Sequence, residues 1–128
     1  MTFAFSQSSL ERREGVDQRL IDISDLAIRL TKVDFGIPGD GGIRTEARQN
    51  ELYLAGSSKC DGVIKLSNHQ TGKALDVYAY VNGASWEPEH LTSVACAMLQ
   101  AASMLGHKLV WGGHWTTFVD MPHFELSE

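Results

Sequence analysis

Two residues able to bind a metal, His69 and Asp76, lie on either side of a glycine in the stretch SNHQTGKALD. Their separation of seven is odd, so on one unbroken strand their side chains would face opposite ways. They converge only if the chain bends between them. Gly72 supplies that bend, because glycine adopts backbone conformations that other residues avoid. The stretch therefore predicts His69 in a loop and Asp76 near the start of the strand that follows.

A second pair, Asp120 and His123, stands in the stretch DMPHFEL. A separation of three again places two side chains on opposite faces of a regular strand. Pro122 argues against the interior of a helix. A break at DMP would let Asp120 come from a loop and His123 from the strand HFEL.

These side chains together suggest zinc chemistry. Two imidazoles and one carboxylate form a common catalytic zinc set, which leaves the fourth tetrahedral position for water. Zn²⁺ with neutral His69, neutral His123 and ionised Asp76 retains a charge of about +1, which favours a hydroxide there. Asp120 near that water would act as a general base. On spacing alone, a pair of surface histidines with unrelated carboxylates is an equal alternative.

The elements that must position these residues include several helices. Apolar side chains recur at helical spacing over residues 8–31, where Gly15 interrupts the pattern or divides it into two helices. Ser8 and Glu11 resemble a capping box at its start. EARQNELYLAG predicts a helix that ends before Gly56, and Glu87 to Leu105 predicts a longer one ended by Gly106.

The β-forming segments gather late in the chain. ALDVYAYV is the clearest strand, and KLVW with TTFVDMPHFEL predicts a closing strand pair around a glycine turn. A shorter strand is expected in VDFG, before a glycine-rich turn. This mixture predicts an α+β fold with a small, central, mostly antiparallel sheet and helices packed on one side of it.

Length and composition limit the function classes. The chain has 128 residues, 43% of them hydrophobic and 21% charged, a length that fits a single domain over residues 1–128. A monomer is expected. The net charge of -5 argues against binding to nucleic acid or anionic lipid, and no apolar run predicts a membrane span or anchor. No secretory signal is recognisable. Cys60 and Cys96 are expected to be free thiols of a reducing compartment.

SNHQTGKALD and DMPHF together resemble a paired motif, Ser-x-His-x6-Asp and Asp/Glu-x-x-His. This pair marks the zinc peptidases that include D-alanyl-D-alanine carboxypeptidases and dipeptidases and the phage L-alanyl-D-glutamate endopeptidases. The wider group takes in lysostaphin-type enzymes and the hedgehog signalling domain. GGIRTEARQNELYLAG and WGGHWTTFVDMPHFEL resemble segments of the phage endolysin branch. The resemblance covers about residues 5 to 126.

The resemblance implies a role for each matching residue. His69, Asp76 and His123 would hold one zinc ion per chain, Asp120 would be the base, and Arg44 would face the substrate. A guanidinium near the scissile carbonyl stabilises the oxyanion or clamps a substrate carboxylate.

Three further positions bear on substrate binding. Asp120 stands where the carboxypeptidase and dipeptidase branches have glutamate, which favours the endolysin branch. His114 follows Trp-Gly-Gly, where that branch often has aspartate. It could donate a proton, act as a transient ligand, line the cleft rim or be a mere replacement. Ser67 could bond the substrate, although serine before a strand is also ordinary turn chemistry. Trp111 and Trp115 are expected to pack on the sheet.

The implied function is hydrolysis of the peptide stem of peptidoglycan, between L-alanine and D-glutamate, by a phage or prophage endolysin. The host cytoplasm is the expected location until a holin-type pore releases the enzyme to the cell wall. One alternative is a D-alanyl-D-alanine carboxypeptidase or dipeptidase. Another is a hedgehog-like zinc-binding module without catalysis, against which Asp120 argues, because such a module needs no general base.

Overall fold

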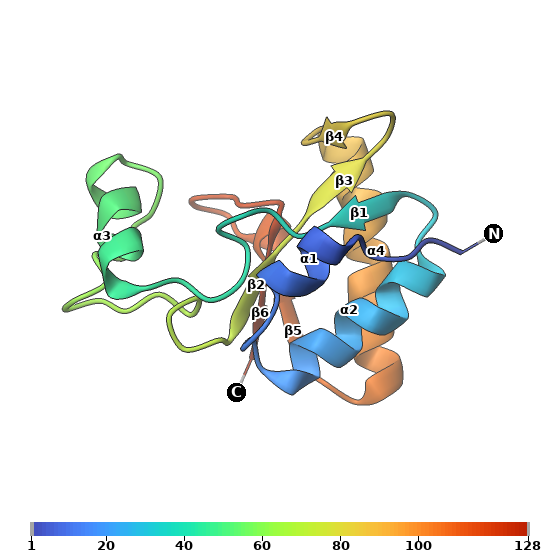
Figure 1. Cartoon of the computed structure of the whole chain (residues 1–128), viewed down its shortest axis with the longest axis horizontal. Helices are drawn as coiled ribbons and strands as arrows, with labels where there is room; N and C mark the ends of the chain where they lie inside the picture. The colour runs from blue at the N-terminus through green and yellow to red at the C-terminus, as the bar shows by residue number, and fades with distance from the viewer. Residues whose placement is uncertain (1, 128) are drawn as a thin grey trace.

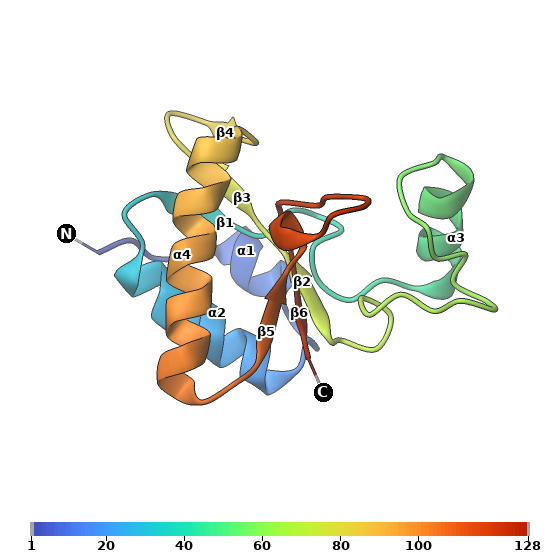
Figure 2. The ribbon, with the colours of Figure 1, turned by 180° about the vertical axis from the view of Figure 1, so that it is seen from behind.

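Two helices, α2 (Gln18–Leu30) and α4 (Pro88–Leu105), contribute much of the apolar core of the computed structural model, which describes residues 2–127. The helices pack against each other, and Figure 2 shows α4 lying across α2. Their facing side chains have no exposed surface, among them Leu20, Ile23, Val94 and Met98. Burying each such side chain contributes about 1.5–3 kcal/mol. Hydrophobic burial therefore holds this part of the molecule together.

The helix ends follow local chemistry. α1 (Gln7–Arg12) begins at Ser6, whose hydroxyl oxygen accepts the N–H of Ser9, so the predicted capping box of Ser8 and Glu11 is wrong. Gly15 has a positive φ of 82° and separates α1 from α2, as the sequence predicted. α4 starts with proline at its first position and ends at Gly106 in the left-handed region, with φ 77°.

The strands form two small antiparallel sheets in place of the single predicted sheet. One has the order β1 (Asp34–Gly36), β3 (Tyr78–Tyr80), β4 (Ala84–Ser85). The other has the order β2 (Ala74–Asp76), β6 (His123–Leu126), β5 (Leu109–Trp111). α4 contacts β3 of one sheet and β5 of the other and so bridges them. The α+β class and the antiparallel pairing are confirmed.

The run ALDVYAYV, predicted as one strand, divides between the two sheets. β2 ends at Asp76 and β3 begins at Tyr78, in the other sheet. The Asp76 N–H donates to the Gly41 carbonyl and the Val77 N–H to the Pro122 carbonyl, so loops take over the backbone bonds at the junction. The expectation that Asp76 lies near the start of a strand is therefore wrong: it closes β2.

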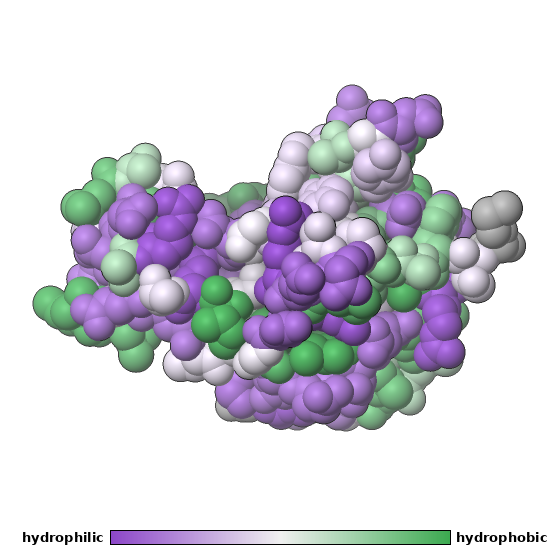
Figure 3. Space-filling model, in the orientation of Figure 1, coloured by the Kyte–Doolittle hydropathy of each residue, from purple (hydrophilic) through white to green (hydrophobic). Residues whose placement is uncertain are grey.

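Residues 46–66, here called the arm, stand away from the rest of the molecule in Figure 1. The arm consists of α3 (Glu46–Leu54) and the loop that follows, and its one buried helical residue is the polar Gln49. Gly56 follows the helix with φ 80°, as expected. Leu54 is 75% exposed and Ile64 90% exposed, and Figure 3 shows apolar surface at the outer edge of this region.

Between β5 and β6 the chain makes one 3-10 turn, η1 (Gly112–His114), and then a loop over residues 115–122. Among residues 2–127, no helix has the length and apolar character that crossing a membrane requires.

Candidate metal centre

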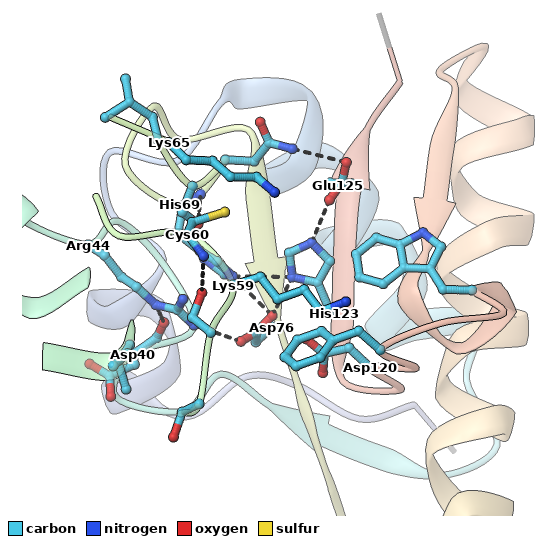
Figure 4. A pocket seen from close by; sticks show the side chains of 18 of the residues that line it. Asp40, Arg44, Lys59, Cys60, Lys65, His69, Asp76, Asp120, His123 and Glu125 are labelled. Carbon is cyan, nitrogen blue, oxygen red and sulfur yellow. Dashed lines mark hydrogen bonds and ion pairs between the residues drawn. The ribbon is translucent and has the colours of Figure 1, made fainter. Parts of the chain in front are cut away.

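Three side chains converge where β2 meets β6, as the sequence predicted. The His69 Nε2 lies 3.1 Å from the Asp76 Oδ1, and the His123 Nδ1 lies 3.0 Å from the same oxygen. The two imidazole nitrogens are 3.3 Å apart. Figure 4 shows the three groups pointing toward one another. Three atoms with lone pairs at such short range need a cation between them, either a proton or a metal ion.

The spacing of these atoms suits zinc. Ligand distances of about 2.0–2.1 Å in a tetrahedral site place the ligand atoms about 3.3 Å from one another. The observed separations of 3.0, 3.1 and 3.3 Å are close to this value. The three residues therefore fit one face of a tetrahedral site without rearrangement of the backbone.

Each candidate ligand is oriented by a hydrogen bond at its other end. The His69 Nδ1 donates to the Gly42 carbonyl at 3.0 Å, which leaves the Nε2 to face inward. The His123 Nε2 lies 2.8 Å from the Glu125 Oε1, which leaves the Nδ1 inward. The Arg44 guanidinium donates to the Asp76 Oδ2 at 3.1 Å. Partners of this kind fix tautomer and ring orientation in metal sites.

The local fold explains why these groups meet. Asp76 and His123 are direct partners in the antiparallel β2–β6 pair, so their side chains leave the same face. Gly72, with φ 76°, turns the preceding loop, and the Lys73 N–H donates to the Asn68 carbonyl across that turn. The Gly72 bend predicted from the sequence is confirmed. It returns His69 to the end of the strand.

Burial and charge act against each other at this site. Burial alone would raise the pKa of Asp76, but hydrogen bonds from His123 and His69 outweigh it and hold that pKa well below its usual range. Burial would lower the pKa of His123, but Asp76 and Glu125 raise it to about 9. The hydrogen bond from His123 also lowers the pKa of Glu125. The carboxylates thus favour positive charge on the His123 imidazole.

Asp120 approaches the same cavity from the loop after η1. The His123 N–H donates to the Asp120 carbonyl, and the Asp120 N–H donates to the Gly112 carbonyl. A Cβ on Gly112 would clash with the Asp120 backbone, so glycine is required for this close approach. Burial and the neighbouring Asp76 raise the pKa of the Asp120 carboxyl. A raised pKa suits a group that must accept and return a proton.

Arg44 lies beside the candidate ligands and is largely buried, with 12% of its side chain exposed. Its Nε donates to the Asp40 carbonyl, one terminal nitrogen to Gln49 Oε1 and the other to Asp76 Oδ2. The alternative of an exposed surface arginine does not describe this position. The structure shows Arg44 fixing Asp76, while its predicted contact with substrate stays a prediction.

A cavity of about 740 Å³ opens over the three candidate ligands. Arm residues such as Lys59 and Cys60 line one side, and Trp115, Phe118 and Asp120 line the other. The cavity is large enough for several residues of a peptide.

The remaining predicted positions differ in their relation to this cavity. Ser67 lines it, but its hydroxyl already accepts the His69 N–H. His114 is exposed, packs its ring against Trp111 and does not line the cavity. A substrate contact by either residue stays a prediction.

Three residues that matter here were missed or misplaced from the sequence. Glu125 pairs with His123, and the alternation of a strand could have revealed it two positions later on the same face. Trp115 was expected to pack on the sheet, but it lines the cavity with its ring 5.2 Å from that of His123. Trp111 is buried as expected. Gln49 binds Arg44, and no sequence signal distinguishes it from a surface polar residue.

The two cysteines are both free, as predicted. Cys60 lines the cavity but is not part of the group formed by His69, Asp76 and His123. The structure therefore agrees with a nitrogen and oxygen donor set.

The fold and this donor set define a small α+β protein with a candidate metal centre in a peptide-sized cavity. Residues 1–126 match the model of the phage L-alanyl-D-glutamate peptidase family, and the chain belongs to that family. It is 34% identical over 129 residues to the L-alanyl-D-glutamate peptidase of Escherichia phage T5, covering 99% of this chain and 91% of that protein.

A solved structure gives the same picture. The crystal structure of the L-Ala D-Glu endopeptidase ChiX from Serratia marcescens matches with a TM-score of 0.85 and 37% sequence identity. The match covers 97% of this chain and 90% of that one. The predicted resemblance to phage endopeptidases is therefore confirmed.

Proposed function

We propose that this protein is a zinc-dependent endopeptidase that hydrolyses the L-alanyl-D-glutamate bond of the peptidoglycan peptide stem. One observation supports the zinc site above all others. Each of the inward atoms of His69, Asp76 and His123 is free to bind a metal because a separate group holds the other end of its side chain. The relatives' names supply the bond, and the resemblance to the phage endolysin branch supplies the peptidoglycan stem as substrate.

His69, Asp76 and His123 would hold the ion. Bound there, zinc would supply a Lewis acid that polarises a carbonyl and lowers the pKa of water. The residues around it do the rest. Asp120 accepts a proton from the attacking water and returns it to the nitrogen of D-glutamate as the C–N bond breaks. Its raised pKa makes the carboxylate a stronger base and so favours the first transfer, in which it gains the proton from water.

Arg44 acts in this proposal by holding the Asp76 carboxylate in one orientation. Its own position depends on the Asp40 carbonyl and on Gln49. A guanidinium this close to the cavity also adds positive potential where the oxyanion develops. Trp115 and Phe118 line the opposite side of the cavity.

The test is digestion of purified peptidoglycan followed by mass spectrometry of the muropeptides. The expected products are a stem that ends in L-alanine and a free peptide that begins with D-glutamate. Release of a single D-alanine would instead show a carboxypeptidase. No product from the zinc-loaded protein would favour a binding module without catalysis.

A parallel measurement tests the metal. Elemental analysis is expected to find one zinc ion per chain, lost with a chelator and restored by Zn²⁺. Acid should release it too, because imidazoles bind metal only when neutral. Full activity in a metal-free preparation would contradict the zinc proposal.

A further inference from the structure

Two lysines of the arm, Lys59 and Lys65, line the cavity, and the mechanism above gives neither a role. In Figure 4 the Lys59 side chain extends from the arm into the cavity. Its Nζ lies 5.0 Å from the centre of the Phe118 ring, which belongs to the loop on the opposite side. This contact holds a cation between the two walls.

Phe118 is unusual in its backbone. Its φ is 50°, in the left-handed region that side chains other than glycine and asparagine rarely adopt. Strain of this kind persists only where the surrounding structure enforces it, and it is concentrated at functional sites. The strained residue therefore presents its ring to Lys59 two positions before the proposed base, Asp120.

The substrate supplies a matching charge. In an L-alanyl-D-glutamate bond, the glutamate nitrogen belongs to the bond that breaks. Glutamate carries two carboxyl groups, and a peptide that continues from one of them leaves the other as a free carboxylate. That anion lies a few bonds from the nitrogen that Asp120 would protonate.

Arg44 is committed elsewhere, because each of its three guanidinium nitrogens already donates to the protein. Arg48 pairs with Asp40 and Glu51. Lys59 differs from these arginines because its ammonium contacts an uncharged partner, the Phe118 ring on the opposite wall of the cavity. An aromatic face leaves the ammonium protons available to an anion.

We infer that Lys59, positioned by Phe118, binds the free carboxylate of the D-glutamate residue and gives the enzyme its preference for glutamate over an amidated counterpart. This inference rests on the proposed function and names the group that selects the residue after the scissile bond. A charge-assisted hydrogen bond distinguishes a carboxylate from a carboxamide of the same shape.

The experiment compares two soluble peptides that differ only at this group. One contains L-alanyl-D-glutamate with its carboxylate free, and the other carries the carboxamide. The zinc-loaded parent is expected to cleave the carboxylate peptide with a kcat/KM about tenfold higher. Lys59→Met should remove that preference by lowering kcat/KM for the carboxylate peptide and leaving the carboxamide peptide unchanged.

Three further variants sharpen the result. Lys65 lines the same cavity, and Lys65→Met should keep the preference for the carboxylate peptide. Lys32 is exposed outside the cavity, and Lys32→Met should keep it too. Phe118→Leu keeps an apolar side chain but loses the aromatic face, so it should lose part of the preference. Zinc content is measured for every variant.

The outcomes separate two failures. A parent that cleaves neither peptide refutes the proposed function, and this inference falls with it. A parent that cleaves both equally well refutes only the role of Lys59. Equal losses on both peptides in Lys59→Met, or a lost preference in Lys65→Met with Lys59→Met unchanged, also overturn the assignment.

Discussion

The arm and the rest of the molecule, here called the body, are held in place by different forces. In the body, α2 and α4 bury side chains such as Leu20 and Met98 completely. In the arm, α3 buries only Gln49, and Leu54 and Ile64 are exposed. Apolar burial fixes the body, whereas a few polar contacts fix the arm.

Those polar contacts lead to the candidate metal centre. Gln49 accepts from Arg44 and donates to the Ser58 hydroxyl and the Cys60 carbonyl. Arg44 in turn holds Asp76. The body therefore carries the candidate ligands, while the arm supplies the opposite wall of the cavity. Through Gln49 and Arg44, the arm also helps to orient the Asp76 carboxylate.

The largest effect is expected from a change to a ligand on the body. Asp76→Asn removes the anionic oxygen that faces both histidines and weakens the partner of Arg44. Zinc content should fall, and turnover should drop by roughly 10³-fold or more, because the metal supplies several kcal/mol of transition-state stabilisation. Elemental analysis and muropeptide turnover measure both.

A matched control exists on the surface. Glu87, Glu89 and His90 form a second group of possible ligands at the start of α4, outside the cavity. His90→Ala should leave both zinc content and turnover at the parent level. If His90→Ala lost zinc and Asp76→Asn kept it, the metal would bind at the start of α4, and the proposed site would be wrong.

Asp120→Asn should separate chemistry from metal binding. The asparagine keeps size and polarity but accepts no proton, so turnover should fall by roughly 10²-fold, as expected for a lost general base. Zinc content and thermal stability should stay near the parent values. Asp120→Glu should recover only part of the activity, because its longer side chain misplaces the carboxylate. If Asp120→Asn loses zinc as readily as Asp76→Asn, Asp120 is a ligand or a support.

A change at Gln49 tests whether polar contacts hold the arm independently of the apolar core of the body. Gln49→Ala removes the hydrogen bond that joins the arm to Arg44 and two hydrogen bonds within the arm, all of them partly buried. The arm should loosen, with faster proteolysis within residues 46–66 and lower turnover. The cost of Gln49→Ala in unfolding free energy should be about 1–3 kcal/mol. Met98→Ala in the body should cost about 2–5 kcal/mol without exposing the arm. Equal proteolysis of the arm in both variants would show that arm and body unfold as one unit.

The smallest effect concerns a polar contact of the body. Asp17 caps α2 and binds Arg19 and Lys73, and these hydrogen bonds hold its pKa below the usual range. A carboxyl whose pKa is lowered by folding adds stability above its unfolded value of about 3.9, and this stability is lost as the pH falls.

Asp17→Asn keeps a capping side chain but loses the charge. It should cost about 1 kcal/mol near pH 7, and the difference from the parent should shrink as the pH is lowered from 5 toward 2. Denaturant unfolding at several pH values measures this. Asp22→Asn, at an exposed position on α2, should show no such trend.

The sequence predicted the parts of the molecule that depend on local chemistry. The end of α4 at Gly106 and the bend at Gly72 follow from residue types and spacing. Spacing alone left the meeting of His69 with Asp76 as one of two equal alternatives, and the resemblance to the paired motif favoured it. The division between β2 and β3 does not follow from residue types and spacing, because the carbonyls of Gly41 and Pro122 decide it from distant loops.

The site shows the same contrast. His123 could be identified from its motif, but the role of Gln49 depends on Arg44 and on the fold of the arm. Trp115 carries no motif that distinguishes a cavity wall from a sheet contact. Only a three-dimensional arrangement reveals such residues.

The pairing of β2 with β6 has a consequence for biosynthesis. Asp76 and His123 become neighbours only through this pair, although they lie 47 positions apart in the sequence. A ribosome-bound chain that has grown past His69 and Asp76 still lacks the third candidate ligand until residues 123–126 emerge and add their strand. Since an incomplete set holds zinc weakly, the proposed zinc ion would be acquired only after translation of β6. Partly made chains would then remain without hydrolytic activity.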